Sequence, residues 1–256
     1  MHFYDDAYPA APEASLRPPN ASVADYAAVQ DALGTERVVV VQPTTYGLDN
    51  RVQLDGVEQI GESARAVVVI DASVEDSTLR AFTDLGVRGA RFHMLPGGAV
   101  GWDHLEPVAK RIADFGWHIQ LQSNGHELAA RKQQLLALAC PLVIDHVGRF
   151  MGPVEPESEP YSALLDLVDA GAQVKLSAPY ESATDSSHRY EMVGRCVKAL
   201  VERAPDRMLW ASNWPHPGQA DPPSEADLVR LRTEWLPTPE LRDQVLVTNP
   251  ATLYDF

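Results

Sequence analysis

The run Val38-Val39-Val40-Val41, which ends at Gln42-Pro43, decides the fold of this chain. Consecutive β-branched apolar residues closed by a proline are typical of a strand that is buried on both faces of a parallel sheet. Further apolar runs predict strands at 66–70, 88–93, 117–122, 142–146, 173–177 and 208–213. The sequence therefore predicts a parallel sheet of seven strands.

Helical segments separate these strands. The clearest helix starts pair a cap residue with a carboxylate or a proline, at Ser22–Asp25, Ser73–Asp76, Ser224–Asp227, Thr238-Pro239 and Asn249-Pro250. A closed barrel needs eight strands, and we expect the stub His2-Phe3-Tyr4 to be the end of the eighth. The prediction is an α/β fold, a (β/α)₈ TIM-like barrel with a truncated first strand, as one domain over residues 1–256.

Composition excludes several classes of protein. Hydrophobic residues make up 45% and charged residues 22%, and the net charge is -15, which disfavours nucleic acid and anionic membranes as partners. The N-terminus shows no signal peptide, and no apolar run is long enough to span a membrane. Two cysteines without CxxC spacing indicate a reducing compartment, so we expect a cytoplasmic protein. A homo-oligomer stays open.

Polar residues gather at the carboxyl ends of the predicted strands, where parallel α/β folds place their chemistry. The candidate site residues are His2, Gln42, Tyr46, Arg91, Gln122, His146, Arg149, Lys175, Ser177, Tyr180, Asn213 and His216. The strand ends also carry Asp71, His93, Gln120 and Asp145. Because an unpaired buried polar group costs about 1–3 kcal/mol, this pattern favours an active site over a structural core. For Lys175, a structural ion pair is an equal alternative.

Five segments, in this order, resemble a known family. They are QPTTYGLDN (42–50), RGARF (88–92), DHVGR (145–149), KLSAPY (175–180) and SNWPH (212–216). Together they resemble the amidohydrolase superfamily, in the branch of 2-pyrone-4,6-dicarboxylate lactonase and galactarolactone isomerase. This resemblance implies a distorted (β/α)₈ barrel that acts on lactones without a metal, although many superfamily members bind one or two divalent metals.

Two departures from the family pattern matter. The family's first strand carries His-x-His, whereas here only His2 is present and Met1 occupies the middle position. Either the natural chain starts further upstream, or the first strand is shortened. At the last strand, hydrolytic relatives carry Asp, whereas this chain has Asn213, as isomerase-like members do. Both departures weaken a metal site, so we expect no cofactor, with a divalent metal as the less favoured alternative.

The resemblance and the residue chemistry together predict a small anionic lactone or sugar acid as substrate. We expect these side chains to converge at one barrel mouth, where Arg91 and Arg149 bind a carboxylate and Tyr46 and Gln122 hold hydroxyls. His146 is expected to transfer protons, and Lys175 and Asn213 to stabilise the oxyanion. His2 is a further catalytic candidate, and the remaining predicted substrate contacts are Gln42, Ser177, Tyr180 and His216.

The reaction itself has alternatives. A neutral amide cannot take a proton near pH 7, so Asn213 favours isomerisation of the lactone over its hydrolysis. Hydrolysis stays close behind, because His146 is also able to activate water. A metal-dependent amidohydrolase and a catalytically impaired relative that only binds an acidic sugar ligand are the other open alternatives.

Overall fold

The computed structural model describes residues 1–182 and 190–256 of the chain, which divides into two compact units. Unit 1 comprises Met1–Gln120 and Asn213–Pro222, and unit 2 comprises Leu121–Ser212 and Pro223–Phe256. Both units alternate strands with helices, and the sheet has seven strands whose order follows the chain. The predicted α/β class and the seven predicted strands are confirmed.

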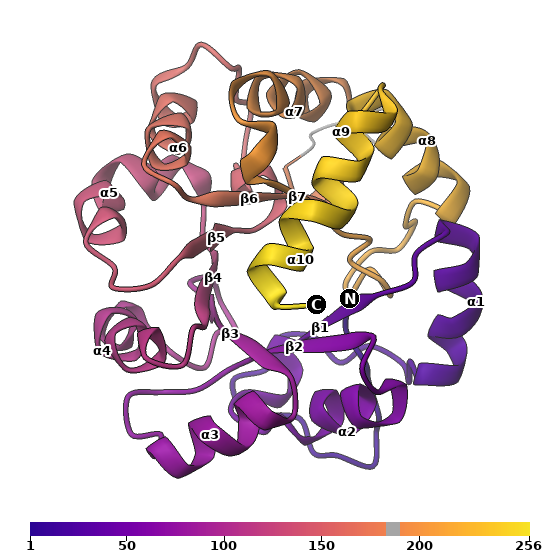
Figure 1. Ribbon diagram of the computed structural model, residues 1–256, viewed down its shortest axis with the longest axis vertical. Helices are drawn as coiled ribbons and strands as arrows, with labels where there is room; N and C mark the ends of the chain where they lie inside the picture. The colour runs from indigo at the N-terminus through magenta and orange to yellow at the C-terminus, as the bar shows by residue number, and fades with distance from the viewer. Residues whose placement is uncertain (183–189) are drawn as a thin grey trace. The chain divides into compact units, whose positions relative to one another are not determined.

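Unit 1 holds the first three strands, β1 (Val38–Val41), β2 (Ala64–Val68) and β3 (Val87–His93), which pair in parallel. Its helices are α1 (Val23–Leu33), α2 (Arg51–Ile60), α3 (Asp76–Asp84) and α4 (Trp102–Ala113). Helix α2 packs on β1 and β2, and helices α3 and α4 pack on β3 (Figure 1). Apart from the half-buried Val39, the apolar residues of these strands are almost fully buried, as the continuous apolar runs predict. Strand β4 (His118–Gln122) begins in unit 1 and ends in unit 2.

The predicted stub of an eighth strand keeps strand-like hydrogen bonds without forming a regular strand. The α-amino group of Met1 donates to the Val39 carbonyl at 3.1 Å, and the Val41 amide donates to the Met1 carbonyl at 2.9 Å. On the other side, the His2 amide donates to the Trp214 carbonyl at 2.9 Å. Within unit 1, these few residues therefore lie between β1 and the 213–216 segment.

The helix starts of unit 1 follow the predictions in part. Ser22 and Asp25 form the expected capping box, and Gly34 ends α1 in the left-handed region at φ 65°. Ser73 does not cap a helix, because its amide and hydroxyl both donate to the Asp71 carboxylate, at 2.8 and 2.6 Å. Helix α3 therefore begins later than predicted, after the N-cap residue Glu75.

Unit 2 holds β5 (Leu142–Ile144), β6 (Gln173–Leu176) and β7 (Met208–Trp210), which also pair in parallel. Its helices are α5 (Leu128–Leu136), α6 (Glu159–Asp169), α7 (Glu191–Arg203), α8 (Glu225–Trp235), α9 (Pro239–Asp243) and α10 (Asn249–Tyr254). Strands β5 and β7 end at Ile144 and Trp210, before the predicted last residues His146 and Asn213, whose positive φ angles lie outside the β region. Among the described helices, none has the length and apolar character needed to cross a membrane.

The predicted caps of unit 2 differ in outcome. Ser224 and Asp227 form a capping box, and Thr238 accepts from the Leu241 amide at the start of α9. Asn249 does not cap α10. Its amide nitrogen instead donates to the carbonyls of Pro205 and Met208, at 2.8 and 2.7 Å. The Asn249 side chain therefore connects α10 to β7 by hydrogen bonds and does not act as the N-cap of the helix.

Candidate active site

The ends of β1 and β3 meet through Arg91 and Gln42 in unit 1. Arg91 is only 6% exposed, and its Nη1 donates to the Gln42 carbonyl at 2.7 Å. The buried Gln42 side chain donates through Nε2 to the carbonyls of Gly47 and Asp49, at 3.1 and 2.8 Å. Gln42 therefore holds the turn after β1, and Arg91 is fixed to the end of that strand. Substrate binding by the Gln42 side chain stays a prediction.

Two further predicted residues of unit 1 contact the N-terminal segment. The Tyr46 hydroxyl donates to the Asp5 carbonyl at 3.0 Å and accepts from the Asp5 amide at 2.8 Å. Burial raises the pKa of Tyr46, so this hydroxyl stays protonated. The Nδ1 atom of His2 lies 2.7 Å from the Val41 carbonyl. A carbonyl only accepts, so Nδ1 carries a proton in this contact and Nε2 is the basic nitrogen of a neutral ring.

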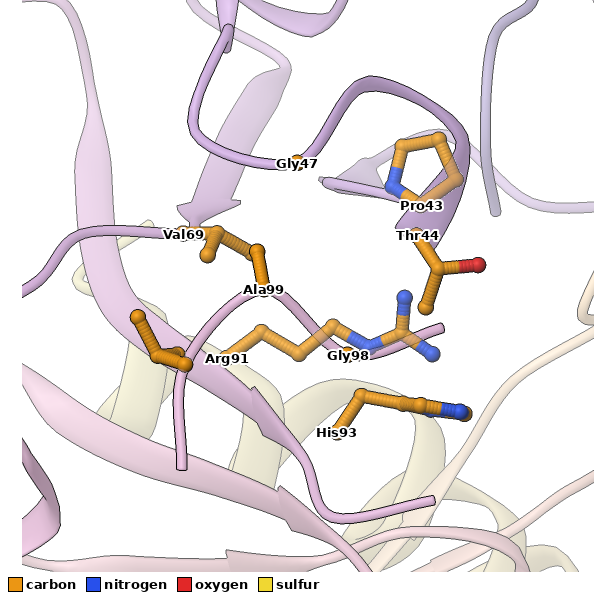
Figure 2. A pocket seen from close by; sticks show the side chains of 9 residues that line it. Pro43, Thr44, Gly47, Val69, Arg91, His93, Gly98 and Ala99 are labelled. Carbon is orange, nitrogen blue, oxygen red and sulfur yellow. The ribbon is translucent and has the colours of Figure 1, made fainter. Parts of the chain in front are cut away.

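A pocket lies beside Arg91, beyond the ends of the first three strands (Figure 2). It is lined by Pro43, Thr44, Gly47, Val69, Arg91, His93, Gly98, Ala99 and Val100, and the space within it, open solvent included, is about 230 Å³. Figure 2 shows the Arg91 guanidinium and the His93 ring pointing toward the same side of the pocket. The sequence placed His93 at a strand end but gave it no role. The pocket offers an anionic group the Arg91 cation and the ring nitrogens of His93.

Asn213 and His216 belong to one tight turn of unit 1. The His216 amide donates to the Asn213 carbonyl at 2.8 Å, and both residues have positive φ angles, 60° and 61°. Non-glycine residues in this region cost about 1–3 kcal/mol of backbone strain and are typical of functional sites. Burial lowers the pKa of His216 to about 4, with a smaller effect of the Met1 ammonium. His216 is therefore neutral at pH 7 and contributes hydrogen bonds rather than charge.

In unit 2, His146 and Ser177 lie just beyond the ends of neighbouring strands, β5 and β6. The Nδ1 atom of His146 is 2.9 Å from the Ser177 Oγ, and both residues are buried. A hydroxyl both donates and accepts, so Ser177 holds the ring in either tautomer. His146, Val147 and Arg149 all have positive φ angles, which concentrates backbone strain in this turn. The structure thus brings together two of the predicted site residues.

The same strand ends carry a buried ion pair. The Lys175 Nζ atom lies 3.0 Å from an Asp145 carboxylate oxygen, and the two side chains are 9% and 1% exposed. Of the two alternatives that the sequence left open for Lys175, the structure contains the ion pair. Asp145 directly precedes His146, so this pair links the backbone that carries His146 to β6.

Replacing Lys175 with Met is expected to lower the free energy of unfolding by about 3–5 kcal/mol, because it leaves the Asp145 charge buried without its cation. Urea denaturation followed by circular dichroism measures this change. The matched control is Lys198→Met, which breaks an exposed pair with Glu202 and is expected to cost less than about 1 kcal/mol. Equal losses of unfolding free energy in the two variants would contradict a structural role for the buried pair of Lys175 and Asp145.

Arg149 has a partner that the sequence analysis missed. Its Nε donates to a Glu181 carboxylate oxygen at 2.9 Å, and the two side chains are each 17% exposed. The signal was present, because Glu181 directly follows the KLSAPY segment. Gln122 is buried at the end of β4, and Tyr180 is half-buried in the turn after β6. The Arg149 charge is thus compensated by Glu181 within unit 2.

The candidate residues do not fit a resident divalent metal. Within residues 1–182 and 190–256, no group of three or more His, Cys, Asp or Glu side chains is arranged to hold a metal ion. Asn213 offers only a neutral amide, and Asp145 is committed to Lys175. The described candidate residues therefore act on a substrate without an assigned metal ligand among them.

Comparisons with known proteins support the resemblance noted in the sequence. A family model described as amidohydrolase matches residues 1–256. The chain is 34% identical to D-galactarolactone isomerase of Agrobacterium fabrum, over 99% of this chain and 89% of that protein. It is also 34% identical to 2-pyrone-4,6-dicarbaxylate hydrolase of Comamonas testosteroni, over 96% of this chain and 85% of that protein. An apo crystal structure from Agrobacterium tumefaciens superposes with a TM-score of 0.94 at 34% identity, covering 100% of this chain and 94% of that one.

Proposed function

The chain belongs to the amidohydrolase family, and from this premise we propose that it isomerises a small lactone that carries a carboxylate group. The superfamily resemblance over the whole chain supports an enzyme. Relatives that are 34% identical over at least 96% of the chain are named for an isomerase and a hydrolase, and the isomerase is named for a lactone. The observation that carries the proposal is Asn213, a neutral amide at the position where the resemblance implies Asp in hydrolytic members.

Isomerisation moves the ester bond within one molecule. A substrate hydroxyl attacks the lactone carbonyl carbon, a new C–O bond forms, and the old ring C–O bond breaks. The attacking hydroxyl loses one proton and the leaving ring oxygen gains one, so no water is consumed. The attacking group is already part of the substrate, and proximity therefore supplies much of the acceleration.

We assign the roles as follows. His146 takes the proton from the attacking hydroxyl and returns it to the leaving oxygen, with Ser177 holding the ring at 2.9 Å. The Asn213 amide donates to the oxyanion that forms at the carbonyl. Arg91 binds the substrate carboxylate through its planar fork of donors. Lys175, which is paired with Asp145, is assigned to positioning the His146 turn rather than to the carbonyl.

Hydrolysis is the second candidate, and the similarity to the Comamonas testosteroni hydrolase favours it. In that reaction His146 would remove a proton from water instead of from the substrate. Proton NMR and mass spectrometry on galactaro-, glucaro- and fucono-type lactones separate the two reactions. A new lactone of unchanged mass supports isomerisation, and an open-chain acid supports hydrolysis. No turnover of any of these lactones would contradict both.

We also propose that the reaction needs no metal. The rate of lactone turnover is expected to be unchanged after exhaustive dialysis against EDTA, because the described side chains do not form a divalent metal site. The control is the same protein dialysed in parallel and then supplied with Zn²⁺ or Mn²⁺, which should not raise the rate. A loss of activity on chelation that either metal restores would overturn this proposal.

A further inference from the structure

We propose that His93 is a specificity-determining residue that forms, with Arg91, an anion subsite in the pocket of unit 1. The subsite would select lactones with a carboxylate over neutral lactones of the same ring. The inference rests on the proposed function for the identity of the substrate. The binding of an anion in this pocket is testable without it.

The position of His93 follows from strand geometry. Arg91 and His93 are two residues apart in β3, so their side chains leave the same face of the strand. Arg91 is fixed at one end by its 2.7 Å hydrogen bond to the Gln42 carbonyl. Figure 2 shows the guanidinium, the His93 ring and the Thr44 side chain gathered on one side of the pocket. A carboxylate placed there would meet donors from more than one strand end.

The loop after β3 holds His93 in place. The Gly98 amide donates to the Leu95 carbonyl at 3.1 Å, which closes a turn directly beyond the strand. A Cβ atom at Gly98 would lie 1.9 Å from the His93 carbonyl oxygen, so only glycine lets this loop fold back onto the strand end. The pocket wall formed by Gly98, Ala99 and Val100 therefore depends on the backbone position of His93.

The charge of the lining points to an anionic ligand. The whole chain carries a net charge of -15, so an acidic substrate needs local cations to offset the repulsion of the protein's field. Arg91 is always charged, and His93 donates a hydrogen bond in either protonation state. Pro43, Val69 and Val100 form the apolar walls beside these two donors.

The test measures binding of galactarate, an open-chain sugar diacid, by isothermal titration calorimetry. His93→Leu is expected to raise the Kd about tenfold or more, because it removes a donor to a charged group. Arg91→Met should raise the Kd at least as much, and His93→Lys, which places an ammonium donor at this position, should stay within about threefold of the wild type. The matched control is His104→Leu on α4, outside the pocket lining, which should bind as the wild type does.

Kinetics give a second readout for this inference. With a carboxylated lactone as substrate, His93→Leu should raise KM about tenfold and leave kcat within about threefold, since uniform binding is lost. With D-galactono-1,4-lactone, which has no carboxylate, neither constant should change. If His93→Leu does not fold by circular dichroism, His93→Phe, which also lacks a donor, replaces it in both measurements.

The outcomes separate this inference from the proposed function. A Kd for galactarate that is unchanged in a folded His93→Leu variant, or no binding to the wild type at millimolar concentrations, overturns the anion subsite. Galactarate binding that depends on His93, in a protein that turns over no lactone, supports the subsite and contradicts only the proposed function.

Discussion

His146→Asn is expected to lower kcat/KM for the lactone by at least about 100-fold, within the 10²–10⁴-fold contribution of general acid–base catalysis. The imidazole is buried, and its Nδ1 lies 2.9 Å from the Ser177 hydroxyl, which holds the ring for proton transfer. An amide cannot shuttle a proton near pH 7, so the variant keeps the polarity of the side chain and loses the chemistry. Initial rates with a carboxylated lactone measure the effect.

Asn is chosen at this position so that a loss of rate is attributable to the missing imidazole and not to a change in the backbone. His146 has a φ of 55°, and Asn adopts this region more readily than Ala, so a loss of rate would not reflect added backbone strain. Ser177→Ala should reduce the rate less than His146→Asn does, because it removes only a positioning contact. His104→Asn on α4, a half-buried histidine with no assigned role, serves as the control. Wild-type turnover in a folded His146→Asn variant would remove His146 from the mechanism.

The second large effect is expected at Asn213. Asn213→Gly should lower kcat by about 10²–10³-fold, the range measured for removal of a single oxyanion donor. Glycine accepts the positive φ of 61° without strain, so the substitution deletes the amide and preserves the turn that ends at His216. Thermal melting and steady-state kinetics on the same preparation distinguish lost chemistry from lost structure.

Asn213→Asp gives a sharper version of this test. The aspartate also tolerates a positive φ, but its carboxylate accepts rather than donates hydrogen bonds at pH 7. We expect isomerisation to fall as far as in Asn213→Gly, and any remaining product to shift toward the open-chain acid, because a carboxylate is able to take a proton from water. Undiminished isomerisation in this variant would contradict an oxyanion role for the amide.

Combining the two substitutions tests whether His146 and Asn213 act on one substrate. Groups that serve one transition state are non-additive, so the double variant His146→Asn/Asn213→Gly should lose much less than the product of the two single losses. Fully multiplicative losses would indicate that the two residues act independently. The rate losses of the single and double variants thus test whether the two side chains act in the same reaction step.

The sequence alone located most of the strands, because a strand buried on both faces is a continuous run of apolar residues. Val38–Val41 forms β1 with the predicted bounds, and the Ser22 capping box starts α1 where expected. The predictions failed where a polar side chain has more than one possible hydrogen-bond partner. Ser73 donates to Asp71 instead of capping α3, and Asn249 donates to two distant carbonyls instead of capping α10. Residue type sets which bonds a side chain is able to make, but tertiary neighbours decide which one forms.

For the candidate site, too, the sequence predicts which residues are present at the strand ends but not which partners they bind. The sequence by itself determined which polar residues end the strands, since strand ends follow from the apolar pattern and parallel strands present their carboxyl ends at one edge. Only the tertiary structure decided their partners: Asp145 for Lys175, Glu181 for Arg149, and a shared pocket for Arg91 and His93. Such contacts depend on strand register and on turns with positive φ, which long-range packing imposes and which local sequence patterns do not encode.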